Sequence, residues 1–154
     1  MLAKIFSPGN DSTLTSLALL CLRLWLGLTL LLNHGVGKVK AFDSMAHSFA
    51  DPFNIGHTAS FSLVVFAEVV AASLIALGLV TRFAALVLLV NMAVAFVYVH
   101  KLMLNGGHSG ELAFIYLAGF FTLFLAGPGR ISLDQRLFGG GRSSSPKKSK
   151  SSDK

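Results

Sequence analysis

Four long apolar segments constrain the fold of this chain more than any other feature. They cover residues 14–33, 59–79, 83–99 and 110–126. An α-helix needs about 20 apolar residues to cross the hydrocarbon core of a bilayer, within a range of about 17–25. All four segments fall in this range, and the last gains a helix start from Ser109 as N-cap and Glu111 in the first turn. We therefore predict an all-α fold, a four-helix transmembrane bundle.

The composition agrees with a membrane location. Charged residues make up 13% of the 154 residues and hydrophobic residues 53%, and the mean hydropathy is +0.68. Soluble domains carry about 25% charged residues, so we expect the surface of this chain to face lipid. Arg23 inside the first segment argues against a cleaved signal peptide. A single cysteine, Cys21, excludes an intrachain disulfide and a dithiol redox mechanism.

The end of the chain differs from the rest. Residues 139–154 are mainly Gly, Ser and Lys, and they predict a disordered basic tail after a membrane domain of residues 1–138. Because the tail follows a membrane domain, attraction to anionic lipid headgroups explains its charge better than nucleic-acid binding does. The predicted partner is thus the lipid bilayer and not nucleic acid.

The first loop, residues 33–58, contains a helical pattern. Val39, Phe42, Met45 and Phe49 are spaced by three and four residues and would share one face of a helix. This pattern predicts a short interfacial helix lying on the membrane surface and ending before Pro52. An ordinary packed loop is the alternative.

The positive charges predict the orientation, because Lys and Arg concentrate on the cytoplasmic side of a membrane. Four crossings place both termini and the second turn on one side. That side carries Lys4, Arg82, Arg130, Arg136, Arg142, Lys147, Lys148, Lys150 and Lys154. The other side carries Lys38, Lys40 and Lys101. We predict a multi-pass protein of the bacterial inner membrane with both termini in the cytoplasm.

Two charged residues, Arg23 and Glu68, stand in the middle of apolar segments. A central charge costs about 2.5–3.5 kcal/mol on insertion scales, and pairing inside the bundle lowers this cost. A rise of 1.5 Å per residue places the two at similar depths, so an Arg23–Glu68 ion pair is predicted. A packing role and a functional role both stay open for the pair. Asn91 and Tyr116 lie at the same level and are expected to serve mainly in packing.

The five histidines all fall at the outer side or its rim: His34, His47, His57, His100 and His108. His34 follows Arg23 by eleven residues and would lie on the same helix stripe, which makes it the best candidate for a function, followed by His100. Haem between facing histidines is an alternative, but both candidates lie at helix ends. The sequence contains no HExxH motif and no spaced Cys/His set, so no metal site is predicted.

The order and spacing of several segments resemble those of the DoxX family of small bacterial membrane proteins. These segments are RLWLGLTLLLNHGVGK (23–38), EVVAASLIALGLVTRFAAL (68–86), the VH pair at 99–100 and GPGRISLDQ (127–135). The resemblance extends over residues 14–138 and implies a four-helix membrane bundle. It also implies a role as a membrane partner of oxidoreductases, with links to quinones, sulfur compounds and oxidative stress.

Three functions follow as hypotheses. In the first, the chain is a quinone-linked redox subunit of a membrane oxidoreductase system, in which Arg23, His34, Glu68 and His100 bind a quinone. Glu68 and His34 would be the catalytic residues that move protons. In the second, the chain is a non-catalytic anchor for a partner enzyme, and in the third a small-molecule or lipid transporter. The sequence does not decide between an enzyme and a binding protein, or between a monomer and a homo-oligomer.

Overall fold

The computed structural model describes residues 12–138, and this part of the chain is helical without strands. The first long helix runs without a break through α2 (Ser12–Leu30), the π-helical turn η1 (Leu31–Gly35) and α3 (Val36–Lys40). The second consists of α5 (His57–Phe66), η2 (Ala67–Ala71) and α6 (Ala72–Leu77). The third consists of α7 (Thr81–Val94) and η3 (Ala95–Val99), and the fourth is α8 (Glu111–Ala126). Two short helices, α4 (Phe42–Met45) and α9 (Leu133–Phe138), complete the described part.

The first three long helices are long and apolar enough to cross a membrane. The candidate spans within them, Thr13–Lys40, His57–Leu77 and Thr81–Val99, contain 28, 21 and 19 residues, whereas α8 is apolar but shorter, with 16 residues. The predicted fold class is therefore confirmed, since three to four apolar helices of this all-helical chain could span a bilayer. The first helix ends at Lys40 and not at the predicted residue 33. The predicted basic tail, residues 139–154, lies outside the described residues.

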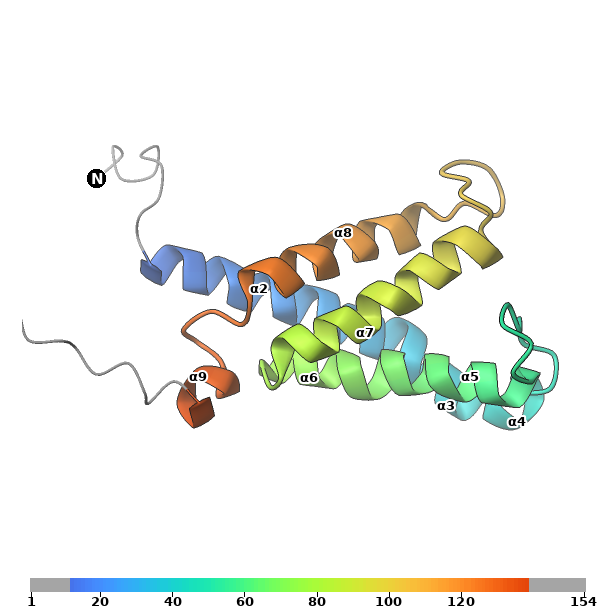
Figure 1. Ribbon diagram of the computed structural model, residues 1–154, viewed down its shortest axis with the longest axis horizontal. Coiled ribbons are helices and arrows are strands. Elements are labelled where there is room, and N and C mark those ends of the chain that lie inside the picture. Colours follow the sequence, from blue (N-terminus) through green and yellow to red (C-terminus); the bar gives the residue numbers. More distant parts are fainter. Residues whose placement is uncertain (1–11, 139–154) are drawn as a thin grey trace, which may run out of the picture.

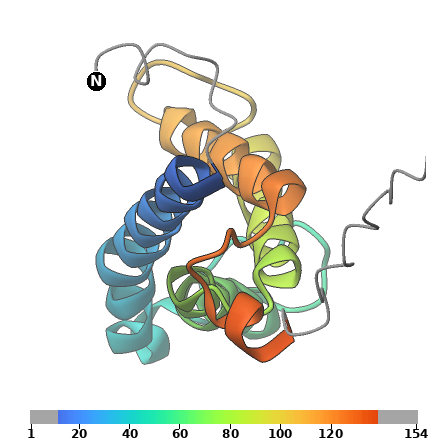
Figure 2. The ribbon, with the colours of Figure 1, turned by 90° about the vertical axis from the view of Figure 1, so that its left-hand side faces the viewer.

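The four long helices alternate in direction, and neighbours in sequence are neighbours in space (Figure 2). The buried core between them is built from Leu, Phe and many small residues. Small residues matter most between the first two helices, because they let backbones approach closely in a membrane. A Cβ at Gly27 would lie 2.8 Å from the Ala72 carbonyl oxygen, and one at Gly35 would lie 2.7 Å from the Glu68 carbonyl oxygen.

One end of the bundle, here the terminal end, is formed by the turn between α6 and α7 and by α9 (Figure 1). Gly78 ends the second helix in the left-handed region, with φ of 70°. The Asp134 carboxylate accepts hydrogen bonds from the backbone N–H groups of Val80 (2.6 Å) and Thr81 (2.9 Å). Asp134, which belongs to α9, thus caps the start of α7 and holds α9 against the turn.

The opposite end, here the loop end, carries the segments 41–56 and 100–110. Figure 1 shows α7 and α8 diverging from α5 towards this end. The first of these segments holds the short helix α4, as predicted. It is also packed against the bundle, because the rings of Phe42 and Phe49 lie 5.3 and 4.8 Å from that of Phe61 on α5.

Candidate functional site

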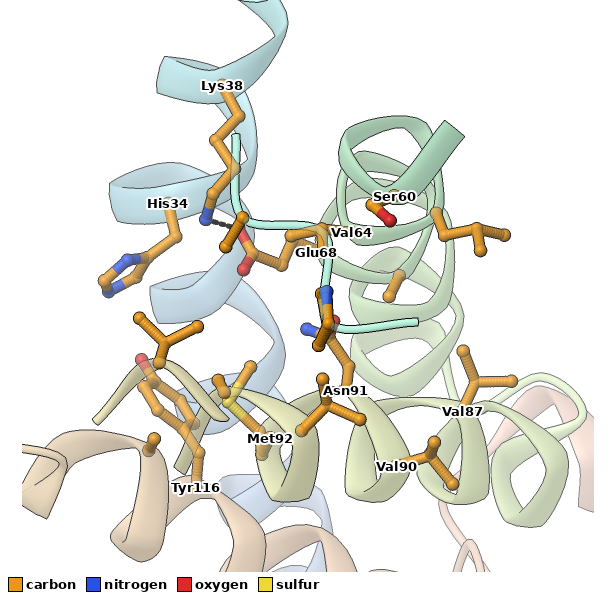
Figure 3. Close-up of a pocket in the computed structure, with 18 of the residues that line it drawn as sticks. His34, Lys38, Ser60, Val64, Glu68, Val87, Val90, Asn91, Met92 and Tyr116 are labelled. Carbon is orange, nitrogen blue, oxygen red and sulfur yellow. Dashed lines mark hydrogen bonds and ion pairs between the residues drawn. The ribbon is translucent and has the colours of Figure 1, made fainter. Parts of the chain in front are cut away.

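A cavity of about 820 Å³ lies at the loop end, between the first two helices and the last two. Its wall is mostly apolar, and small-molecule sites in proteins commonly have such walls with a few polar groups. The polar or titratable side chains among its lining residues are His34, Lys38, Ser60, Glu68, Asn91, His100, Ser109 and Tyr116. Figure 3 shows Lys38, Glu68, Asn91 and Tyr116 reaching towards a common region from four different helical segments. This cluster is the candidate site.

Three π-helical turns help to position the cluster. His34 lies in η1, Glu68 lies in η2, and His100 directly follows η3. A π-helical turn contains an extra residue, so its backbone hydrogen bonds run from residue i to i+5 instead of i+4. Such turns occur often at functional sites. The extra residue also rotates all later side chains around the helix axis by about 100°. A side chain beyond one of these turns therefore points to a different side of the helix from the side that regular helical periodicity predicts.

An ion pair stands at the centre of the site. The Lys38 ammonium donates a hydrogen bond of 2.5 Å to the Glu68 carboxylate, and the two side chains are 20% and 7% exposed. Removing a charge from water is costly, and an opposite charge in direct contact offsets much of that cost. Glu68 is thus held as a partnered carboxylate inside an apolar wall. Lys38 was not among the predicted site residues, because the predicted first helix ended before it.

Two further polar groups in the cavity are available for hydrogen bonding. Among the described residues, no hydrogen bond reaches the side-chain amide of Asn91 or the hydroxyl of Tyr116. Tyr116 is only 4% exposed, and its ring stacks on Phe120 and meets the edge of His34. An amide and a hydroxyl left open towards a cavity can accept a ligand that brings the missing partners.

The two predicted histidines differ in their surroundings. His34 lines the cavity, but Figure 3 shows its ring turned away from the Glu68 carboxylate. His100 lies at the rim, where its Nδ1 atom is 3.0 Å from the backbone oxygen of His108. His34, Glu68 and His100 are therefore brought to one cavity, as the sequence predicted, without a direct hydrogen bond between Glu68 and either histidine.

The predicted Arg23–Glu68 ion pair is wrong. Arg23 is fully buried at the terminal end, where its Nη2 atom donates to the backbone oxygen of Ile131. Its Nε and Nη1 atoms have no hydrogen-bond partner among the described residues, and Asp134 is the acid that interacts with it electrostatically. Arg23 packs beside Gly78, and ten residues of helix, or about 15 Å of rise, separate Gly78 from Glu68. Arg23 does not line the cavity.

No group of three or more His, Cys, Asp or Glu residues in the described part of the chain could hold a metal ion. The donors around the cavity are instead hydroxyl, amide, imidazole and ammonium groups. Such groups suit the oxygen atoms of an uncharged or anionic organic ligand.

A carboxylate outside the membrane spans holds the loop beside the cavity. Asp51 accepts hydrogen bonds from Ser60 Oγ (2.7 Å) and from the backbone N–H groups of Gly56 (2.8 Å) and Ile55 (3.1 Å). The bond from Ser60 contributes most to lowering the pKa of Asp51, and the backbone bonds lower it further. Because Phe53 and Ile55 line the cavity, Asp51 fixes part of the cavity wall.

The loop should therefore loosen only in strong acid. A carboxylate whose folded-state pKa is lowered stabilises the folded loop above its ordinary pKa of 3.8, and this contribution is lost as the pH falls through the lowered value. We expect the amide NMR signals of Ile55 and Gly56 to shift with a midpoint below pH 3.8. The variant Asp51→Asn should abolish this titration. A midpoint at or above 3.8 in the unmodified protein would contradict the assignment.

Comparisons with known proteins agree with the resemblance seen in the sequence. The family model described as DoxX matches residues 18–101, which contain Lys38, Glu68 and Asn91. The chain is 32% identical over 133 residues to an uncharacterized membrane protein of Mycobacterium tuberculosis, with 78% of this chain and 81% of that protein covered. It is 37% identical over 76 residues to an uncharacterized protein of Haemophilus influenzae, with 46% and 57% covered. No solved structure gives a significant match.

Proposed function

We propose, from the premise that this chain belongs to the DoxX family of membrane proteins, that it is a quinone-binding subunit of a membrane oxidoreductase system. The observation that supports this most is that Asn91 and Tyr116 carry polar groups without a hydrogen bond among the described residues, beside the Lys38–Glu68 ion pair in an apolar cavity. A quinone headgroup is a flat, largely apolar ring with two carbonyl oxygens. It needs hydrogen-bond donors on an apolar wall, and this cavity provides both.

The side chains of the cavity have separable roles in this proposal. The Tyr116 hydroxyl and the Asn91 amide N–H donate to the carbonyl oxygens and fix the position of the ring. The Lys38 ammonium offsets the negative charge of Glu68, so the carboxylate repels extra electron density on those oxygens less strongly. A bound quinone supplies a couple that takes up two electrons and two protons, and the electrons come from a partner oxidoreductase.

Protons require a route from the aqueous side. Lys38 is partly exposed and bonded to Glu68, so the ion pair connects the interior of the cavity with its rim at the loop end. Glu68 and His34, the two residues for which proton transfer was predicted, both line the cavity and stay the candidates for this role. Arg23 has no place in the proposed site, because it packs at the terminal end.

Quinone binding should depend on Tyr116 and Asn91. We expect a soluble benzoquinone analogue to raise the Tm of the purified protein in lipid nanodiscs and to bind about tenfold more weakly after Tyr116→Phe or Asn91→Leu, since each loses one hydrogen bond of about 1–1.5 kcal/mol. Tyr98→Phe is the matched control, because Tyr98 is exposed and lies outside the cavity lining. If the unmodified protein does not bind, or if all three variants bind equally, a non-catalytic anchor becomes the better explanation.

We also propose that the terminal end faces the cytoplasm. It carries Arg82, Arg130 and Arg136 in the described residues, and the sequence adds the basic tail on the same side. In a Cys21→Ser background, an impermeant thiol reagent applied to intact cells should label Ser48→Cys, an exposed position of the first loop, and should not label Ser149→Cys in the tail. The reverse pattern of labelling would show the opposite orientation.

A further inference from the structure

We infer that the quinone enters this cavity sideways from the bilayer and that its long apolar tail lies in a slot between α5 and α7. This inference rests on the proposed function and narrows the ligand to a class, the membrane quinones that carry an isoprenoid chain. A water-soluble small molecule would need access from the aqueous side instead.

The first observation is the separation of polar and apolar residues around the cavity. Most polar groups reach in from η1, α3, η2 and α8, with Asn91 added from α7 and Ser60 from the start of α5. The wall between α5 and α7 is otherwise formed by Leu63, Phe66, Leu86 and Val90. In Figure 3, Val87 and Val90 lie on the opposite side of the cavity from His34 and Tyr116. A headgroup held at the polar side would therefore direct its substituent towards the slot.

The second observation is that the slot is open to lipid. Leu63, Phe66 and Val90 line the cavity and are also 60%, 49% and 55% exposed. They belong to helices that could span a membrane, so their exposed surface would face acyl chains. Figure 1 shows α5 and α7 moving apart towards the loop end, the end at which the cavity lies.

The third observation is that the loops cover the aqueous side. Asp51 bonds to Ser60 at the start of α5, and Phe49 packs on Phe61. Phe53 reaches across to Tyr98 of the third helix, with ring centroids 5.6 Å apart. A ligand approaching from water would have to displace these contacts, whereas a ligand dissolved in the bilayer would not.

A tail in the slot gains nothing from the hydrophobic effect, because it leaves one apolar environment for another. The test must therefore detect where the tail lies. The blocking variant is Leu63→Trp with Val90→Trp, and the control is Leu32→Trp with Val70→Trp, which enlarges exposed residues of the same types outside the cavity lining. The two probes are a benzoquinone with a decyl chain and the same benzoquinone without the chain, titrated into protein in lipid nanodiscs.

We expect the blocking variant to bind the decyl probe at least tenfold more weakly and the chainless probe within twofold of the unmodified protein. The control variant should bind both probes normally. Equal loss of the decyl probe in the control, or no loss in the blocking variant, would overturn the slot while leaving the quinone site standing. Failure of the unmodified protein to bind either probe would instead refute the proposed function.

A second measurement uses the unmodified protein and does not depend on the folding of a variant. A decyl benzoquinone with a photoreactive diazirine near the end of its chain is crosslinked in nanodiscs, and the labelled residues are mapped. Labelling that an excess of unlabelled probe suppresses should concentrate at Leu63, Phe66, Leu86 and Val90. Suppressible labelling confined to the segments 46–56 and 100–110 would show access from the aqueous side and overturn the inference.

Discussion

Replacing Glu68 with glutamine should destabilise the folded protein by about 3 kcal/mol, which is the lower end of the range for breaking a buried ion pair. The carboxylate is 7% exposed and bonded to Lys38, so Glu68→Gln leaves the ammonium without its counter-charge. Lys38 is 20% exposed and can turn partly towards the rim, and for this reason the cost stays at the lower end. The measurement is a reversible denaturant titration in mixed micelles, followed by helical circular dichroism.

The double variant Lys38→Met with Glu68→Gln distinguishes the effect of losing the ion pair from the effect of changed packing. It removes both charges and leaves an uncharged wall of similar volume, so its stability should lie within about 1 kcal/mol of the unmodified protein. Glu111→Gln is the matched control, because it neutralises an exposed carboxylate in the first turn of α8 and should change stability by less than about 1 kcal/mol. A double variant as unstable as Glu68→Gln alone would mean that the two charges are not coupled.

The sequence was sufficient to predict the helices, because length and hydropathy alone determine which segments can cross a bilayer. His34, Glu68 and His100 were all predicted from the sequence to lie in the outer half of the bundle, and all three line the same cavity. The sequence was not sufficient to identify the partner of Glu68. The first helix continues through Gly35, whose φ of −61° is ordinary helical geometry, and so reaches Lys38.

The position of Arg23 could not be predicted from the sequence for a different reason. Depth was counted from the start of an apolar segment, and that start does not mark a membrane boundary. The hydrogen-bond acceptor of Arg23 is the backbone oxygen of Ile131, in a loop that follows α8. No periodicity connects residues that are 108 positions apart, and a backbone acceptor leaves no signal in the identity of a side chain. The π-helical turns add to the difficulty, because they shift the helical phase within the segments that form the site.

Gly35 should be one of the two least replaceable small residues of the first helix, together with Gly27. Its missing side chain allows the helix to lie against the backbone of the second helix next to Glu68, and this close approach also brings Lys38 within reach of the carboxylate. A Cβ at this position would lie 2.7 Å from the Glu68 carbonyl oxygen and 3.0 Å from Val69 Cγ2. Since the nearest atom belongs to the backbone, a side chain of any size must push the two helices apart.

Gly35→Ala should therefore destabilise the protein by about 1–3 kcal/mol, as expected for overpacking, and Gly35→Leu by more. Gly37→Ala is an internal control with the opposite expected sign. It lies on the same helix, a Cβ added there would meet no described atom within 4 Å, and alanine favours a helix over glycine by about 1 kcal/mol. Denaturant titration of the three variants gives the sign of each change in the free energy of unfolding. Titration with the chainless benzoquinone shows whether Gly35→Ala also weakens binding of the quinone. A Gly35→Ala variant as stable as Gly37→Ala would refute the close contact between the first two helices.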